Sequence, residues 1–503
     1  MHLTPSSFPA RHRPSPRVLS SRVLSSRVLP SLVLSPLVLL LACGDERGTS
    51  ASASAGGTGA TTLPPTTGVG TTEQPTTGLT DGGGTMTGGV SASTGGTADT
   101  AGSTTDGGGL KFDLGGQPDA PPVSACGDGG GGGGMGNLEF SYIWIANSVE
   151  GTVSKIDTEA GVEVGRFVTT PTMEGIGDIN NGPSRTSVNL YGDAAVANRN
   201  GGVTKIAARE ADCIDKNGNG VIDTSTGLAD VKAWGEDECV LWHHPTPTDP
   251  LAYNEGPRPL AWVGALGPDQ CPLKNPPLWV GYYDLAQNLG IFERLNGATG
   301  ETEETVTIPW SGNNWGPYGG AVNKEGDFFV TGWSSGPAAK IDAVTLEPTV
   351  YQPPGFESFY GMALDAKGDV WIAGCDGVIN HLDPNTGEFT YVGMGPGCLR
   401  GIQVDKQGRA FIAHNGFPAG ITVVDTLTKS FINPNVELPG SNVPVGVSID
   451  AEGFVWVVDQ GGWAYKVDPD TYETVLVVSG LNFPYTYSDM TGAGLNLVVN
   501  PPG

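Results

Sequence analysis

Oxygen-bearing side chains recur with a fixed spacing in one polar segment of the chain. Asp215, Asn217 and Asn219 occupy alternate positions, and Asp223 follows four residues later. Numbered from Asp215, these are loop positions 1, 3, 5 and 9, and a glycine stands at position 6. Loops with this pattern bind Ca²⁺ through side-chain oxygens and through the carbonyl of position 7, which is Val221 here. The spacing therefore predicts a calcium site.

The last ligand of this loop must come from another part of the chain. Position 12 is Thr226, whereas an EF-hand has a bidentate glutamate there. The candidates that follow are Glu236, Asp237 and Glu238. The spacing resembles EF-hand-like and thrombospondin type 3 loops, and a plain Asn-Gly turn without metal is the alternative. We expect a bound calcium to be structural, because it would order a long polar insertion at about 211–245.

The first 42 residues have the pattern of a secretion signal. They contain five arginines, no acidic residue and an apolar run from Leu32 to Leu41. The run leads into Leu-Leu-Ala-Cys-Gly around Cys43, which resembles a bacterial lipobox, whose cysteine becomes the lipid-bearing N-terminus. An ordinary signal with a chance cysteine is the alternative. We expect a lipoprotein signal peptide at 1–42, and a lipid anchor at Cys43 that attaches the protein to the membrane of a bacterial cell envelope, on the periplasmic side or the outer surface.

Composition divides the rest of the chain into two parts. Residues 43–136 are mostly Gly, Thr, Ser and Ala and have little to bury, so we expect a disordered low-complexity linker. Residues 137–503 are long enough for one large all-β domain, which we expect to be a monomer. The chain has 26 basic and 53 acidic residues and a net charge of −27, which disfavours nucleic acid as a partner.

Six cysteines remain when Cys43 is set aside. An even number in an exported domain favours disulfides over reactive thiols. We expect Cys213 to pair with Cys239 across the polar insertion, and Cys375 with Cys398 between one repeat and the next. A Cys126–Cys271 pair follows only by elimination.

A repeat of the form Gly-x6-Gly, followed by a short aromatic and β-branched strand, organises the second half of the chain. Its copies begin at Gly319, Gly361, Gly401 and Gly446, which are 42, 40 and 45 residues apart. This is the period of a β-propeller blade, whose small sheet can bury both faces only by stacking against its neighbours.

Counting the strands that follow the turn of each copy predicts seven blades. These second strands are expected at Tyr142–Ala146, Ala194–Ala197, Leu278–Gly281, Phe328–Thr331, Val370–Ala373, Arg409–Ala413 and Val455–Val458. The first lacks a preceding strand, and the piece 483–492 lacks a following one, so we expect the C-terminus to complete the first blade and close the ring. A six-bladed ring, with the irregular third copy as an insertion, is the alternative.

Polar and aromatic residues just beyond these second strands should rim one face of the propeller, where ligands commonly bind. A polar rim without a dedicated ligand is the alternative. The candidate rim residues are Asn147, Asn198, Tyr282, Tyr283, Trp333, His414, Asn415 and Asp459.

The repeat Gly-x6-Gly-x-x-Trp resembles that of virginiamycin B (streptogramin) lyases and related NHL-type propellers. The resemblance implies a magnesium ion and a catalytic histidine that open a cyclic peptide antibiotic by elimination. It would make His414 the general base and Asp459 a magnesium ligand. The glutamate of the lyase blade motif Trp-Phe-Thr-Glu is absent from every copy, for example from Trp371-Ile-Ala-Gly.

These observations predict an envelope-anchored β-propeller lipoprotein that acts as a binding or interaction module and carries a structural calcium. Its ligand would be a peptide, glycan or protein. The alternative is a divergent metal-dependent lyase of the streptogramin type that uses the same rim.

Overall fold

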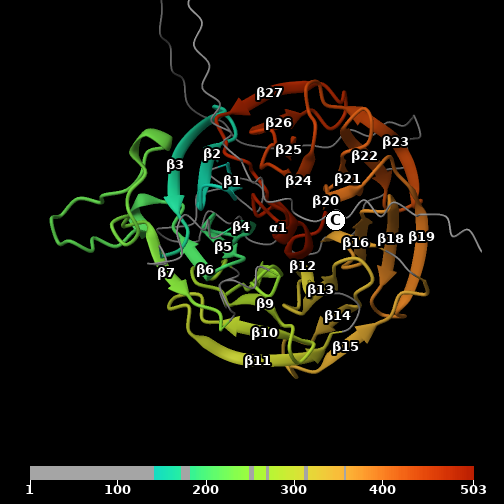
Figure 1. The fold of residues 1–503 in the computed structure, drawn as a ribbon, viewed down its shortest axis with the longest axis horizontal. Helices are drawn as coiled ribbons and strands as arrows, with labels where there is room; N and C mark the ends of the chain where they lie inside the picture. The colour runs from blue at the N-terminus through green and yellow to red at the C-terminus, as the bar shows by residue number, and fades with distance from the viewer. Residues whose placement is uncertain are drawn as a thin grey trace, which may run out of the picture. The chain divides into compact units, whose positions relative to one another are not determined.

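The structure, a computed structural model, describes residues 141–171, 182–247, 254–267, 271–310, 315–355 and 358–502. These residues form seven antiparallel sheets that surround a central channel (Figure 1). The prediction of an all-β seven-bladed propeller is confirmed. The six-bladed alternative is wrong, because the irregular third copy forms a four-stranded sheet of its own.

Each sheet is one blade, and its strands run in chain order from the channel outward. The first blade contains β1 (Tyr142–Asn147), β2 (Thr152–Asp157) and β3 (Val162–Val168). The second contains β4 (Pro183–Val188), β5 (Ala194–Asn198), β6 (Gly202–Ile206) and β7 (Val240–His244). The third contains β8 (Leu260–Trp262), β9 (Leu278–Asp284), β10 (Leu289–Leu295) and β11 (Thr302–Pro309).

The four remaining blades follow the phased repeat. The fourth contains β12 (Pro317–Val322), β13 (Phe328–Gly332), β14 (Ala338–Ile341) and β15 (Pro348–Tyr351), and the fifth contains β16 (Phe359–Leu364), β17 (Val370–Gly374), β18 (Val378–Asp383) and β19 (Glu388–Met394). The sixth contains β20 (Leu399–Val404), β21 (Arg409–His414), β22 (Gly420–Asp425) and β23 (Ser430–Glu437), and the seventh contains β24 (Pro444–Ile449), β25 (Val455–Asp459), β26 (Trp463–Val467) and β27 (Thr474–Ser479). All seven predicted second strands are present.

The two glycines of the repeat have different physical roles. A Cβ on Gly361 would lie 2.0 Å from the carbonyl oxygen of Arg400 in the next blade, and one on Gly446 would lie 2.2 Å from the carbonyl oxygen of Thr486. The first glycine therefore lets adjacent inner strands approach closely at the channel. The second, such as Gly368, has φ +84° in the turn to the next strand, a conformation that glycine adopts without strain.

Tryptophans of the second strands fill the space between blades, as their spacing indicates. Trp144, Trp371 and Trp456 are fully buried. The indole of Trp371 donates to the carboxylate of Asp365 (3.1 Å), and that of Trp456 donates to Asp450 (2.9 Å). Each carboxylate also accepts backbone amides of the turn that follows its strand, so the turn and the core hold each other in place.

The C-terminal segment supplies the inner edge of the first blade, as predicted for 483–492. An isolated antiparallel bridge joins Asn147 to Pro484, and the amide of Trp144 donates to the carbonyl of Met490 (3.0 Å). The pairing consists of separate bonds instead of a continuous strand, and the segment also forms a parallel bridge to β4 of the second blade.

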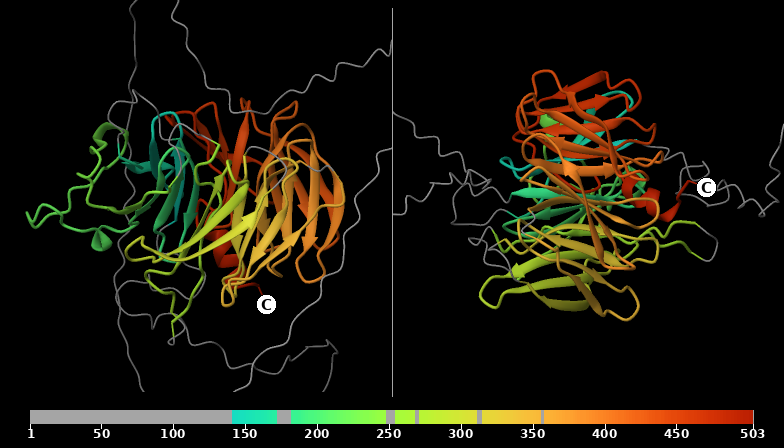
Figure 2. Two further views of the ribbon diagram at one scale, coloured as in Figure 1. Left: turned by 60° about the horizontal axis from the view of Figure 1, so that its bottom comes forward. Right: turned by 90° about the vertical axis from the view of Figure 1, so that its right-hand side faces the viewer.

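Beyond this segment, helix α1 (Ala493–Val499) packs across one end of the channel (Figures 1 and 2). Its side chains Leu495, Leu497 and Val498 are buried, and the helix contacts β12, β16 and β24. The repeat pattern of the sequence contains no signal for this helix. Within the described parts of the chain, no helix has the length and apolar character needed to cross a membrane.

The polar insertion lies within the second blade, between β6 and the outermost strand β7. It contains the short 3-10 helices η2 (Glu210–Asp212) and η3 (Leu228–Asp230). Cys213 pairs with Cys239 across it, and Cys375 with Cys398 between neighbouring blades, so both favoured disulfides are confirmed. The signal, Cys43, the linker and Cys126 lie outside the described residues.

Candidate functional site

The second strands of all blades end at one face of the ring, opposite α1, and this face holds the predicted rim residues. Most of these side chains are buried at the strand ends. Asn147, Asn198, His414 and Asp459 have no exposed surface, and Tyr282 and Tyr283 are also buried. Trp333 and Asn415 are partly exposed.

The two rim asparagines bind within the sheets. Asn147 donates from Nδ2 to the hydroxyls of Thr152 (3.2 Å) and Ser154 (2.8 Å) in its own blade. Asn198 donates to the carbonyl of Thr169 (3.0 Å) and accepts from the hydroxyl of the same residue (2.7 Å). These side chains therefore join strands and loops of the blades.

The neighbouring rim residues are similarly engaged. The Tyr282 hydroxyl donates to Glu293 (3.1 Å), and burial together with this carboxylate raises the pKa of Tyr282. Tyr283 donates to the side chain of Asn288 (3.1 Å). The Asn415 side-chain oxygen accepts the amide of Cys398 (3.0 Å) and so fixes the start of β20.

His414 and Asp459 occupy equivalent positions in adjacent blades. His414 accepts the amide of Gly416 at Nδ1 (3.2 Å), and burial lowers the pKa of its imidazole to about 4, an effect that the nearby Asn435 side chain opposes. Asp459 accepts the hydroxyl of Ser441 (2.6 Å) and three backbone amides. Among the described residues, no group of three or more His, Cys, Asp and Glu side chains is placed to hold a metal ion.

In the predicted calcium loop, the side chains of Asn217 and Asn219 converge on that of Asp223. The side-chain amides of Asn217 and Asn219 both donate to Asp223 Oδ2 (2.8 and 2.9 Å), and Asp215 accepts backbone amides of the loop. Of the three carboxylates considered for the last ligand, that of Glu238 binds the amides of Lys216, Asn217 and Asp223. The loop is exposed, and its Asp215 and Asp223 carboxylates accept hydrogen bonds from the loop itself.

A second set of side chains meets at the centre of the rim face, at the mouth of the channel. In five blades the register of the innermost strand shifts near its start, which is a β-bulge. A bulge re-aims the side chain at that position. The residues at this position, including the corresponding residues of the other two blades, are Ser184, Arg258, Tyr318, Tyr360, Arg400, Val445 and Tyr485.

The tyrosines of this mouth form a buried hydrogen-bonded group that spans three blades. The hydroxyls of Tyr318 and Tyr485 lie 3.2 Å apart, and those of Tyr360 and Tyr487 lie 2.6 Å apart. Tyr360 also bonds to Tyr485, which connects the two pairs. Burial raises the pKa of Tyr487 well above its usual value, so its hydroxyl keeps its proton.

Guanidinium groups stack on these rings. The Arg185 guanidinium lies 4.7 Å from the ring centre of Tyr318 and 4.1 Å from that of Tyr487. Arg400 lies 5.7 Å from the Tyr360 ring, and Arg199 lies 4.6 Å from the Tyr485 ring. We call Arg185, Arg400 and the four tyrosines the Arg–Tyr cluster.

Of the predicted rim residues, Trp333 is brought to this cluster. Its ring centre lies 6.4 Å from that of Tyr318 and 5.8 Å from that of Trp315, and both tryptophans are partly exposed. The cluster itself was not predicted from the sequence. The sequence does contain an indication of this shared position, because the first glycine of each repeat is directly preceded by Tyr318, Tyr360, Arg400 or Val445.

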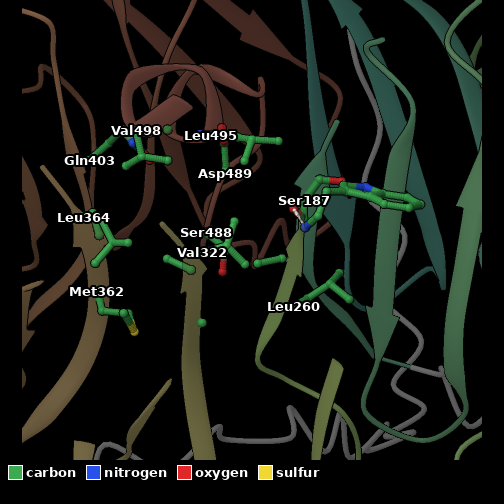
Figure 3. Close-up of a pocket in the computed structure, with 16 residues that line it drawn as sticks. Ser187, Leu260, Val322, Met362, Leu364, Gln403, Ser488, Asp489, Leu495 and Val498 are labelled. Carbon is green, nitrogen blue, oxygen red and sulfur yellow. Dashed lines mark hydrogen bonds between the residues drawn. The ribbon is translucent and has the colours of Figure 1, made fainter. Parts of the chain in front are cut away.

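The opposite end of the channel holds a narrow pocket beneath α1 (Figure 3). Leu260, Val322, Met362 and Leu495 line it together with Asp489. The Asp489 carboxylate accepts the amides that begin α1, including that of Leu495 (2.8 Å), and burial raises its pKa. This carboxylate is therefore used to hold the helix across the channel.

Comparison with known proteins finds similarity at the level of the fold. No protein-family model matches the chain, and no curated protein matches it. A streptogramin B lyase structure matches with 13% identity and a TM-score of 0.43 and covers 63% of this chain and 87% of its own. The propeller is thus distantly similar in structure to the virginiamycin B lyases.

Two further solved structures match to a similar degree. A catalytically inactive virginiamycin B lyase from Staphylococcus aureus with quinupristin has 11% identity and a TM-score of 0.43, covering 64% of this chain and 93% of its own. A protein of unknown function from Bacteroides caccae has 11% identity and a TM-score of 0.40, covering 69% and 97%.

Proposed function

We propose that this chain is a ligand-binding β-propeller, exported and held at a bacterial envelope by lipid on Cys43. The observation that supports it is the form of the channel. Helix α1 lies across one end, and the Arg–Tyr cluster lies at the other, where the inner strands of five blades begin with a register shift. Aromatic and cationic side chains gathered in one place suit recognition of a ligand.

The surroundings of the two lyase candidates favour binding over elimination chemistry. A general base works best with a pKa near the operating pH, whereas burial lowers that of His414 to about 4. Asp459 already accepts hydrogen bonds on both carboxylate oxygens. Neither side chain is exposed. A magnesium ion there would have to displace hydrogen bonds that hold the loop before β24.

We further propose that Asp215, Asn217, Asn219 and Asp223 hold a structural calcium ion, with the carbonyl of Val221. The convergence of Asn217 and Asn219 on Asp223 supports this, as does the disulfide at the base of the insertion. On binding, the two asparagine side chains would turn their oxygens toward the ion. The calcium would stiffen the insertion, which lies on the outer side of the second blade.

Export into an oxidising compartment accounts for the two disulfides of the described residues. The predicted lipid anchor and the Gly/Thr/Ser-rich linker would let the propeller reach ligands at a distance from the membrane.

One experiment separates the binding module from the lyase. The purified full-length protein is incubated with quinupristin and magnesium, and ring opening is followed by mass spectrometry. In parallel, thermal unfolding is measured with a panel of sugars, peptides and organic acids. We expect an unchanged antibiotic and at least one stabilising compound whose effect disappears in Tyr360→Phe/Tyr487→Phe. Antibiotic opening that His414→Ala abolishes would overturn the proposal, and so would a panel without any stabilising compound.

A further inference from the structure

We propose that the channel mouth recognises an oxyanion, a carboxylate or phosphate carried by a small organic molecule, through Arg185 and Arg400. This inference rests on the proposed binding function and names the chemical class of its ligand.

Arg185 provides the main observation. Its side chain is 1% exposed, and Nη1 donates to the carbonyl of Ser184 (2.9 Å). Nε and Nη2, which form one edge of the guanidinium, have no hydrogen-bond acceptor. Leaving buried donors unsatisfied is costly, and this edge is the one that binds the two oxygens of a carboxylate or phosphate side by side. The cost is removed if a ligand oxyanion occupies the position.

Arg400 provides a second cation of the same kind. It is 9% exposed, and its Nε also has no acceptor. Tyr487 connects the two arginines, because its ring lies under Arg185 and its hydroxyl bonds to that of Tyr360, on whose ring Arg400 lies.

The charge balance supports an anion from outside the chain. The sequence has twice as many acidic as basic residues, yet among the described residues no carboxylate forms an ion pair with Arg185 or Arg400. The one carboxylate in the rim set, Asp459, is occupied by its own hydrogen bonds. A buried cation without a counterion requires compensation, which a ligand anion would supply.

The aromatic groups beside the cluster indicate that the anion is part of an organic molecule. Trp315 and Trp333 are partly exposed and lie edge to face at 5.8 Å, next to Tyr318. Flat apolar surfaces adjoining a cationic centre can stack the body of a ligand whose charged end reaches Arg185.

The test is titration of the purified full-length protein with citrate, inorganic phosphate and uncharged glucose at low salt, followed by calorimetry and thermal unfolding. We expect citrate or phosphate to bind and to raise the unfolding temperature. Arg185→Gln should weaken that binding at least about tenfold, because two hydrogen bonds to a charged group are lost. In the absence of ligand, the same variant should be as stable as the wild type or more stable, since it removes an uncompensated buried charge.

Controls distinguish this site from others. Arg294→Gln, which removes a guanidinium paired with Glu304, should leave binding unchanged. Arg400→Gln tests the second cation if Arg185→Gln does not fold. Equal oxyanion binding by wild type and both variants would mean adventitious association and overturn the inference. Binding of glucose and of neither anion would also overturn it, while leaving the proposed binding function intact.

Discussion

The state of His414 leads to a prediction that bears directly on whether this residue could act as a base. Its imidazole is fully buried and accepts a backbone amide at Nδ1, so the folded protein holds it neutral. Burial lowers its pKa to about 4, whereas an unfolded histidine titrates near its ordinary value of 6.5. Between these two values the unfolded chain binds the proton and the folded chain does not.

The direction in which pH changes the stability follows from this difference. A group with a depressed folded pKa and a protonated unfolded form makes stability rise with pH, so stability is lost as pH falls from about 6.5 towards 4. Each pKa unit corresponds to about 1.4 kcal/mol, and integration between pH 7 and pH 5 gives a loss of at most about 2 kcal/mol from this residue.

The assay is urea unfolding of the wild type and of His414→Gln at pH 7 and pH 5. We expect the wild type to lose about 2 kcal/mol more unfolding free energy between these pH values than the variant does. His243→Gln is the matched comparison, because burial and the adjacent His244 lower the pKa of His243 to about 4 as well. The two effects should add, since the residues lie in different blades. An identical pH dependence in wild type and His414→Gln would refute the reasoning and return His414 to the list of plausible bases.

Calcium at 100 times its dissociation constant should stabilise the wild type by about 2.7 kcal/mol, measured by thermal unfolding. The double variant Asp215→Ala/Asp223→Ala should lose this stabilisation. The control Asp230→Ala, in the same insertion, should keep it. An unchanged response of the double variant would exclude this loop. Asp459→Asn should lower the free energy of unfolding in urea by about 2–4 kcal/mol, because an amide nitrogen would face buried N–H donors. The control is Asp470→Asn, at a carboxylate whose side chain is 80% exposed, and it should lower the free energy of unfolding by less than about 1 kcal/mol. Similar costs at both positions would contradict the assigned hydrogen bonds. Gly361→Ala should lower the free energy of unfolding by more than about 3 kcal/mol, because the new Cβ would clash with the Arg400 carbonyl oxygen. Gly368→Ala should lower it by only about 1 kcal/mol, because its Cβ would contact no other atom and the only strain would be in the backbone angle φ. A reversed order, measured by the same unfolding assay, would mean that the close approach of inner strands is not what requires the first glycine.

Local features were predictable from the sequence because they depend on neighbours along the chain. The turn at Gly368 needs a positive φ, and the strand after it alternates apolar residues, so the blades could be counted before any contact was known. The pairs Cys213–Cys239 and Cys375–Cys398 were inferred from their positions relative to the repeat. The missing first strand of blade one pointed to the C-terminal segment.

The candidate rim illustrates where this reasoning stops. The position after each second strand could be aligned, but alignment does not reveal where a side chain points. Asn147, Asn198 and Asp459 turn back into the blades because the polar backbone groups of the loops need partners there. Whether a residue is buried depends on its neighbours in three dimensions. The residue pattern at the end of a strand does not predict those neighbours.

The sequence by itself determined the repeat, the number of blades and their closure, because period, turn chemistry and alternating hydrophobicity are local. The tertiary structure alone decided that Arg185 and Arg400, 215 residues apart, both pack against tyrosines at one end of the channel, and that α1 lies across the other. The physical reason is that a ring brings the same strand position of every blade to one centre, and small register shifts at the bulges then determine which side chains face it.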